Sequence, residues 1–170
     1  MKAGGFRLAM KQQKIPHAGS PGSILPTSSQ KNLPFRILVV DDEMSIREVI
    51  STVLTQFGYH VDTAEDGAVG WEALQASSYD LLITDNSMPR VSGVELVKML
   101  RSEGMTLPVV MVSGTLPPEA LNGDSSLQFA ATLLKPFTVK ELVGTVERVL
   151  RRAEVTPGRA VFLPAMAGAA

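Results

Sequence analysis

The chain has 170 residues, of which 45% are hydrophobic, and it contains two histidines and no cysteine. This length suits one domain with tails better than two full domains. Without cysteine there can be no disulfide, thiolate nucleophile or zinc–cysteine site, and two histidines are too few for a multi-histidine metal site. No apolar run approaches the roughly 20 residues of a membrane span, and the first residues lack the apolar core of a secretory signal. We therefore expect a soluble, cytoplasmic protein.

The net charge of −1 is unevenly distributed along the chain. Residues 1–34 carry five basic residues and no acidic residue, whereas residues 35–152 carry ten basic and sixteen acidic residues. An acidic body argues against a nucleic-acid-binding face, which is typically basic. The first segment is rich in proline, glycine and serine without a helical or strand period, so we predict a disordered basic leader over 1–34. We expect the ordered domain over 35–152 and an irregular tail over 153–170.

Apolar, β-branched runs alternate with amphipathic stretches in the middle of the chain. In chain order, the patterns predict strands at 35–40, 59–64, 80–84, 107–112 and 131–134, and helices at 46–57, 69–76, 94–104 and 142–152. Between the fourth and fifth strands, Pro117 and Pro118 can open only a short helix, because Gly123 follows. Five β–α units with short connections predict an α/β fold with a doubly wound, five-stranded parallel sheet and helices on both faces.

Polar residues follow four of the predicted strands at their carboxyl ends, where such sheets bind ligands. They are Asp41 and Asp42, Asp85, Ser113, and Lys135. Carboxylates brought this close together repel one another unless a cation holds them, and oxygen ligands without imidazole or thiolate favour Mg²⁺. A magnesium site with open coordination positions commonly meets phosphate. Asp85 can act as a nucleophile because carboxylates form acyl phosphates, while Lys135 and Ser113 suit phosphoryl oxygens. The pattern indicates phosphoryl transfer onto an aspartate.

Four motifs at these positions resemble the receiver domain of bacterial two-component response regulators, over residues 36–152. The motifs are VVDDE at 39–43, ITDNSMPRVSG at 83–93, VSG at 112–114 and KPF at 135–137. The resemblance implies a flavodoxin-like receiver fold with Asp85 as the phosphoacceptor. It implies that Asp41, Asp42, Asp85 and the backbone carbonyl of Ser87 hold Mg²⁺, and that Ser113 and Lys135 contact the phosphoryl group. It also implies a cis peptide bond between Lys135 and Pro136.

The resemblance implies a single-domain, chemotaxis-regulator-like response regulator rather than an enzyme, although such a domain assists its own phosphorylation and dephosphorylation. The phosphodonor would be a sensor histidine kinase or a phosphotransfer protein, and the phosphorylated state would signal through contacts with a downstream protein. The 18 residues after Arg152 are too few for a DNA-binding module. One alternative is an inactive, receiver-like interaction module. Another is a magnesium-dependent phosphatase with an aspartyl phosphate, whose general acid would be an aspartate at the position of Ser87.

Other residues near the motifs carry simpler expectations. His60 is expected to be a surface or edge residue, and the methionines at 99, 105 and 111 are expected to be packing or surface residues. Family members typically place an aromatic residue three positions before the lysine, and this chain has Thr132 there. We therefore expect no aromatic rotamer switch, and we expect phosphorylation to change the order of residues 113–130 instead.

Overall fold

The computed structural model describes residues 34–115 and 127–155, with side chains up to residue 153. Its strands are β1 (Arg36–Val40), β2 (His60–Ala64), β3 (Leu81–Asp85), β4 (Val109–Ser113) and β5 (Ala131–Leu134). Its helices are α1 (Met44–Gln56), α2 (Gly67–Ala76), α3 (Gly93–Ser102) and α5 (Val139–Val155). The leader, residues 156–170 of the tail and the short helix expected between Pro117 and Gly123 lie outside the described residues.

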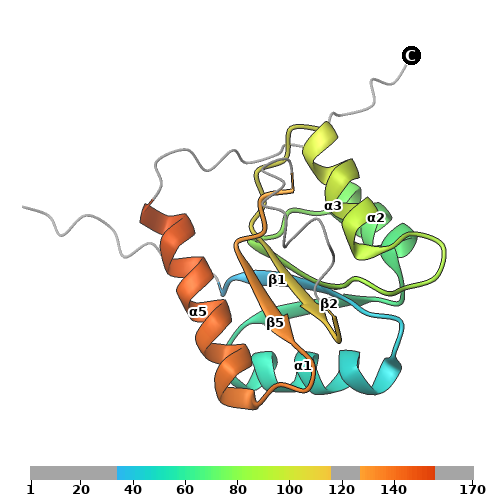
Figure 1. The fold of residues 1–170 in the computed structure, drawn as a ribbon. Coiled ribbons are helices and arrows are strands. Elements are labelled where there is room, and N and C mark those ends of the chain that lie inside the picture. The colour runs from blue at the N-terminus through green and yellow to red at the C-terminus, as the bar shows by residue number, and fades with distance from the viewer. Residues whose placement is uncertain (1–33, 116–126, 156–170) are drawn as a thin grey trace, which may run out of the picture. The chain divides into compact units, whose positions relative to one another are not determined.

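All five strands form one parallel sheet in the order β2-β1-β3-β4-β5 (Figure 1). Every residue of β3 and β4 is buried, as is all of β1 except Arg36. This explains their continuous apolar sequences, because a parallel strand covered on both faces has no solvent side. β2 and β5 are the edge strands, and the exposed His60 on β2 matches its expected place. The doubly wound fold expected from the sequence is confirmed.

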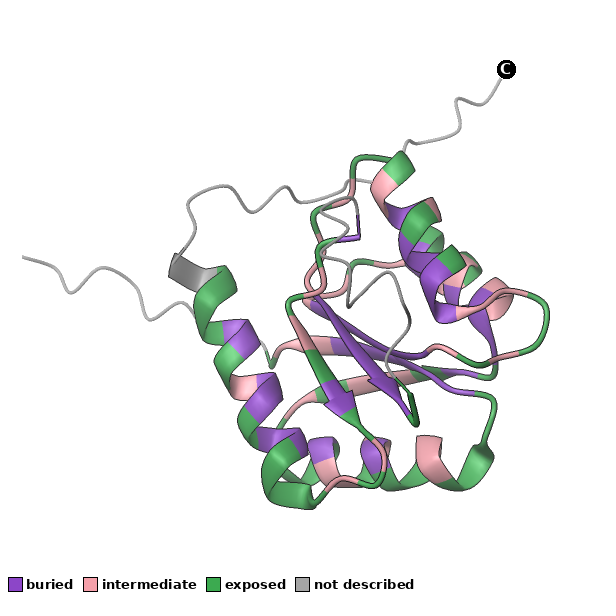
Figure 2. Ribbon diagram, viewed as in Figure 1, coloured by how far each residue is buried: buried purple, intermediate pink, exposed green. Residues whose placement is uncertain are grey.

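Two hydrophobic cores lie on opposite faces of the sheet (Figure 2). Alternate residues of β1 face different cores: Ile37 packs with α1 and α5, whereas Leu38 packs with α2 and α3. Burying a side chain of this kind contributes about 1.5–3 kcal/mol, so both layers matter to stability. Of the predicted packing methionines, Met111 is fully buried in the second core, and Met105 packs against that core.

Capping side chains that apolar periodicity alone does not locate fix the starts of α3 and α5, whereas α1 has no side-chain cap. Helix α5 begins three residues before its predicted start, because Thr138 and Glu141 form reciprocal hydrogen bonds. The Thr138 N–H donates to Glu141 Oε2 at 2.8 Å, and the Glu141 N–H donates to Thr138 Oγ1 at 3.2 Å. Ser92 and Glu95 form the same capping box at the start of α3. Within the described residues, no helix is long and apolar enough to cross a membrane.

Candidate functional site

The carboxyl ends of the central strands bring buried polar side chains to one edge of the sheet. Asp41 follows β1, Asp85 ends β3 and Ser113 ends β4, and their exposed fractions are only 1%, 4% and 2%. The register pairs Asp85 with Val112, so Ser113 lies one residue beyond the partner of Asp85 on the adjacent strand. Lys135 comes directly after β5 and supplies the positive charge at this edge.

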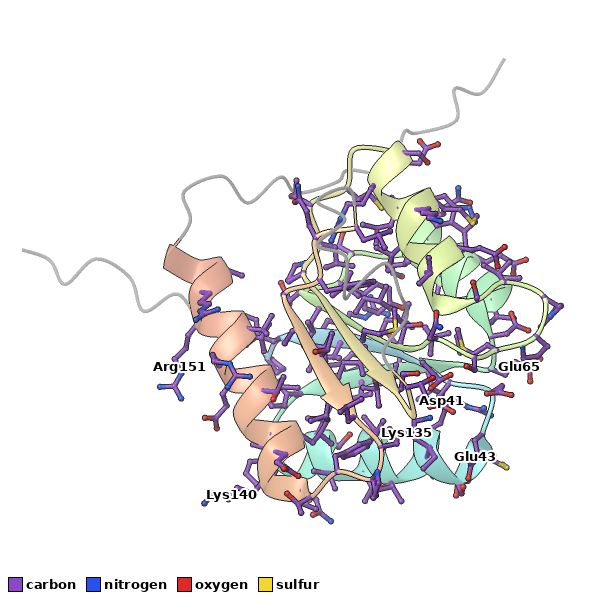
Figure 3. The ribbon with its side chains drawn as sticks, viewed as in Figure 1. Asp41, Glu43, Glu65, Lys135, Lys140 and Arg151 are labelled. Carbon is purple, nitrogen blue, oxygen red and sulfur yellow. The ribbon has the colours of Figure 1, made fainter. Side chains whose placement is uncertain are left out.

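Lys135 bridges the two buried carboxylates. Its Nζ lies 2.7 Å from Asp41 Oδ2 and 2.9 Å from Asp85 Oδ1. Figure 3 shows Asp41 and Lys135 meeting at the sheet edge, with Glu43 and Glu65 near the same edge. Two buried carboxylates this close would be costly without a cation, and the ammonium compensates them. Among the residues predicted to form the site, the structure joins Asp41, Asp85 and Lys135 by direct ion pairs.

Burial acts on the protonation of both Asp41 and Lys135. It raises the pKa of the Asp41 carboxyl above its usual value, although the hydrogen bond from Lys135 acts in the opposite direction. It tends to lower the pKa of the Lys135 ammonium, but the hydrogen bonds to Asp41 and Asp85 outweigh burial, so the pKa of Lys135 is raised. Lys135 is therefore firmly cationic at neutral pH.

Main-chain contacts hold the bridging groups in place. The Lys135 N–H donates to the Ser113 carbonyl at 2.9 Å, and the Lys135–Pro136 peptide bond is cis, as expected. On the other side, the Glu43 N–H donates to Asp41 Oδ1 at 2.9 Å. Arg47 Nη1 donates to the Asp41 carbonyl oxygen at 2.6 Å, a contact that the sequence reasoning missed. Its only sequence signal is an arginine in the first turns of the helix that follows the acid pair.

The remaining predicted metal ligands lie at the surface. Asp42 and Ser87 are exposed, and the Ser87 N–H donates to Asp85 Oδ2 at 2.5 Å. Within the described residues, no three or more His, Cys, Asp or Glu side chains are grouped so that they could hold a metal ion. The Lys135 ammonium lies between the two buried carboxylates.

The loop between β3 and α3 folds back on the strand that carries Asp85. The carbonyl of Asn86 accepts the Gly93 N–H at 3.2 Å, and Asn86 Oδ1 accepts the Val94 N–H at 3.3 Å. A Cβ atom at Gly93 would collide with the carbonyl oxygen of Asp85, so only glycine fits there. Arg90 in the same loop forms an ion pair with Asp66. Sequence reasoning missed both residues of this pair.

Fold and site together define a doubly wound α/β domain with an acid–lysine cluster at the carboxyl edge of its sheet. The chain belongs to the response regulator receiver domain family, whose family model matches residues 37–147. The protein is therefore a two-component signalling protein with a receiver domain, as the four motifs predict.

Relatives and solved structures agree with this membership. The probable transcriptional regulatory protein SilR of Salmonella typhimurium is 36% identical over 121 residues, which cover 69% of this chain and 51% of SilR. PhoP of Bacillus subtilis, an alkaline phosphatase synthesis transcriptional regulatory protein, is 34% identical over 122 residues, which cover 71% of this chain and 50% of PhoP. The chain thus spans about half the length of these curated relatives.

Two solved structures match over nearly the whole length of their chains. The chemotaxis protein CheY4 of Vibrio cholerae has a TM-score of 0.64 and 33% identity, and the match covers 68% of this chain and 98% of CheY4. The response regulator TrrA of Thermotoga maritima, solved in complex with Mg²⁺-BeF, has a TM-score of 0.61 and 31% identity, with coverage of 68% and 98%.

Proposed function

We propose that Asp85 accepts a phosphoryl group from a sensor histidine kinase or a phosphotransfer protein in a Mg²⁺-dependent reaction. The observation that carries this proposal is the ammonium of Lys135, held between two buried carboxylates at 2.7 and 2.9 Å at the carboxyl edge of a receiver-family sheet. Burying two carboxylates with one ammonium is costly, and phosphoryl transfer relies on charges that are held in fixed positions in this way.

The donor chemistry of the site fits Mg²⁺. Asp41, Asp42 and Asp85 offer carboxylate oxygens, the Ser87 carbonyl offers a further oxygen, and no thiolate or imidazole lies among these residues. Hard oxygen donors of this type suit Mg²⁺ rather than zinc. When bound, the ion would neutralise charge on the phosphoryl oxygens and help to align the phosphodonor with Asp85.

The side chains then have separate tasks in transfer. An oxygen of Asp85 attacks phosphorus, so that the new O–P bond forms while the N–P bond of a donor phosphohistidine breaks and leaves the imidazole. Lys135 keeps its positive charge throughout, and we infer that its ammonium pairs with a phosphoryl oxygen once Asp85 carries the acyl phosphate. The hydroxyl of Ser113, one residue beyond the partner of Asp85 on the adjacent strand, donates to another phosphoryl oxygen.

The phosphorylated domain would signal through protein–protein contacts with a downstream target. The phosphoryl group carries about −1.5 to −2 charges, and the Asp85 carboxylate gives up its own charge in forming the acyl phosphate, so the site gains about −0.5 to −1 charge and moves it outward from the carboxylate that Lys135 now compensates. That change in charge is large enough to redistribute the ion pairs at the sheet edge.

Acetyl phosphate with Mg²⁺, followed by intact mass, tests the proposal directly. Wild-type chain should gain the mass of one phosphoryl group, and Asp85→Asn should gain none under the same conditions. Asp42→Asn should still react, but more slowly and with a higher Mg²⁺ requirement. Asp80→Asn is a suitable control, because Asp80 lies next to the amino end of β3 and away from the site.

Each contrary result identifies a different protein. Continuous release of phosphate with many turnovers would indicate a phosphatase. No adduct with either acetyl phosphate or a phosphorylated kinase would indicate an inactive interaction module. An adduct on Asp85→Asn at the wild-type rate would show that another residue is the acceptor.

A further inference from the structure

Arg90 lies in the loop that follows the phosphoacceptor, and it reaches across to the start of α2. Its guanidinium forms an ion pair with Asp66 and lies 3.5 Å from Glu65 Oε1. The Asp66 side chain is only 3% exposed, whereas those of Arg90 and Glu65 are more than half exposed. Asp66 is therefore the anchoring partner, because a buried carboxylate needs its cation far more than a surface one does.

Asp66 has a second task that divides its two oxygens. Asp66 Oδ1 caps α2 by accepting the N–H groups of Ala68 and Val69, at 2.8 and 3.0 Å. Asp66 Oδ2 faces Arg90. A single side chain thus joins the amino end of α2 to the β3–α3 loop, and the two roles can be separated by substitution.

The loop is held in a conformation that its sequence alone does not favour. Arg90 has a φ of 65°, in the left-handed region that residues with a side chain seldom occupy. Arg90 therefore keeps this conformation because contacts elsewhere compensate for it. One such contact is the ion pair of Arg90 with Asp66. Arg90 is three residues after Ser87 in the chain, so this contact acts close to the predicted metal ligand.

We propose that Arg90 and Asp66 are positioning residues for phosphoryl transfer, and that their ion pair holds residues 86–92 so that Asp85 and the Ser87 carbonyl are presented together to Mg²⁺. The proposal rests on the proposed function for its metal step only. Restraint of the loop by the ion pair can be measured without metal or phosphodonor.

Substitutions at both residues separate positioning from stability. Asp66→Asn and Asp66→Ser keep a good helix cap but lose the charge that faces Arg90. Arg90→Ala loses the ion pair and keeps the unfavourable φ, whereas Arg90→Gly loses the ion pair and removes that strain. Arg90→Lys keeps a cation of similar reach. Asp62→Asn is the matched control, because it breaks an Asp–Arg pair with Arg36 in which Asp62 lies in the middle of β2 and Arg36 at the start of β1.

Three measurements are made on each full-length variant: amide hydrogen exchange over residues 86–92, Mg²⁺ affinity by calorimetry, and the thermal midpoint. Exchange over 86–92 should rise in Asp66→Asn, Asp66→Ser, Arg90→Ala and Arg90→Gly. Their Mg²⁺ affinity should fall about tenfold, the lower end of the loss seen when a group that orients a metal ligand is removed. Arg90→Lys should recover most of the affinity, and Asp62→Asn should match wild type in both properties.

Comparison of the thermal midpoint with the Mg²⁺ affinity separates a positioning role from a purely structural one, because a purely structural role would make the two change together. Arg90→Gly should melt at or above the temperature of Arg90→Ala, yet bind Mg²⁺ equally poorly. Unchanged exchange over 86–92 in both Asp66→Asn and Arg90→Ala would overturn the proposal, and so would faster exchange with unchanged Mg²⁺ affinity. If the wild-type chain itself bound no Mg²⁺, both the proposed function and the positioning role would be wrong. Faster exchange in the variants would then show only that the ion pair restrains the loop.

Discussion

At the scale of single residues, Lys135 sets the charge balance of the site. In Lys135→Met the carboxylates of Asp41 and Asp85 remain buried without their cation, so we expect the free energy of unfolding to fall by about 3 kcal/mol at neutral pH. Added Mg²⁺ should recover part of this loss, because a metal ion can replace the missing charge. Urea unfolding with and without Mg²⁺ measures both effects.

Lys140→Met serves as the control for Lys135→Met, since Lys140 is an exposed residue of α5. It should unfold within about 0.5 kcal/mol of wild type, as surface substitutions usually do. A loss at Lys135 no larger than that at Lys140 would contradict a charge-compensating role for Lys135.

Tyr79 gives the domain a second residue-scale property, which appears in alkali. Burial, with Asp62 nearby, raises the pKa of Tyr79 from 10.0 to about 12. The unfolded chain therefore ionises this phenol first, and stability that is complete below pH 10 is lost as the pH rises toward 12. We expect Tyr79→Phe to lose less stability than wild type over this window, as measured by urea unfolding at several pH values. Parallel curves for the two proteins would show that Tyr79 does not contribute to the alkaline loss.

At the scale of elements, the sequence predicts the strands better than the starts of the helices. Strands β1, β3 and β4 are buried on both faces, so their apolar runs are unbroken and easy to recognise. The first turn of α5 is polar and held by Thr138 and Glu141, so apolar periodicity begins only at Leu142. Hydrogen bonds of capping side chains, rather than burial, decide these boundaries.

The start of α3 also depends on close packing at Gly93. In Gly93→Ala the new Cβ would meet the Asp85 carbonyl oxygen, which is backbone and cannot swing away. We expect a loss of about 1–3 kcal/mol in the free energy of unfolding, typical of overpacking, and slower phosphorylation of Asp85 because the strand end must shift. Denaturant unfolding and the acetyl phosphate reaction measure the two effects.

Gly144 offers the opposite case within the same fold. It lies in the interior of α5, and a Cβ there has no atom within 4 Å. Gly144→Ala should therefore raise the free energy of unfolding by about 0.5–1 kcal/mol without changing the reaction at Asp85. If Gly93→Ala and Gly144→Ala changed the free energy of unfolding and the reaction at Asp85 alike, the close contact at Gly93 would not be the cause of the loss.

At the scale of the whole molecule, topology makes most of the site predictable. Parallel strands direct their carboxyl ends to one edge, so residues as far apart as Asp41 and Lys135 can be assigned to one place from the sequence alone. The bridging of Asp41 and Asp85 by Lys135 is less predictable, because it depends on side-chain reach across β5, β4 and β3. The ion pair of Arg90 with Asp66 joins two loops with no common motif, and no periodic pattern indicates it.

The division of the chain that the sequence predicts, into a leader over 1–34 and a receiver domain over 35–152, yields the last prediction. The buried hydrophobic residues of the described structure run from Ile37 to Leu150, and the family model begins at residue 37. A chain that starts at Lys31 should therefore keep the thermal midpoint of the full chain and its rate of phosphorylation by acetyl phosphate. Scanning calorimetry is sensitive enough, because a loss of 1 kcal/mol lowers the midpoint of a domain this size by about 4 °C. A drop of that size, absent in high salt, would show instead that the basic residues of 1–34 bind the acidic body through screened charge interactions.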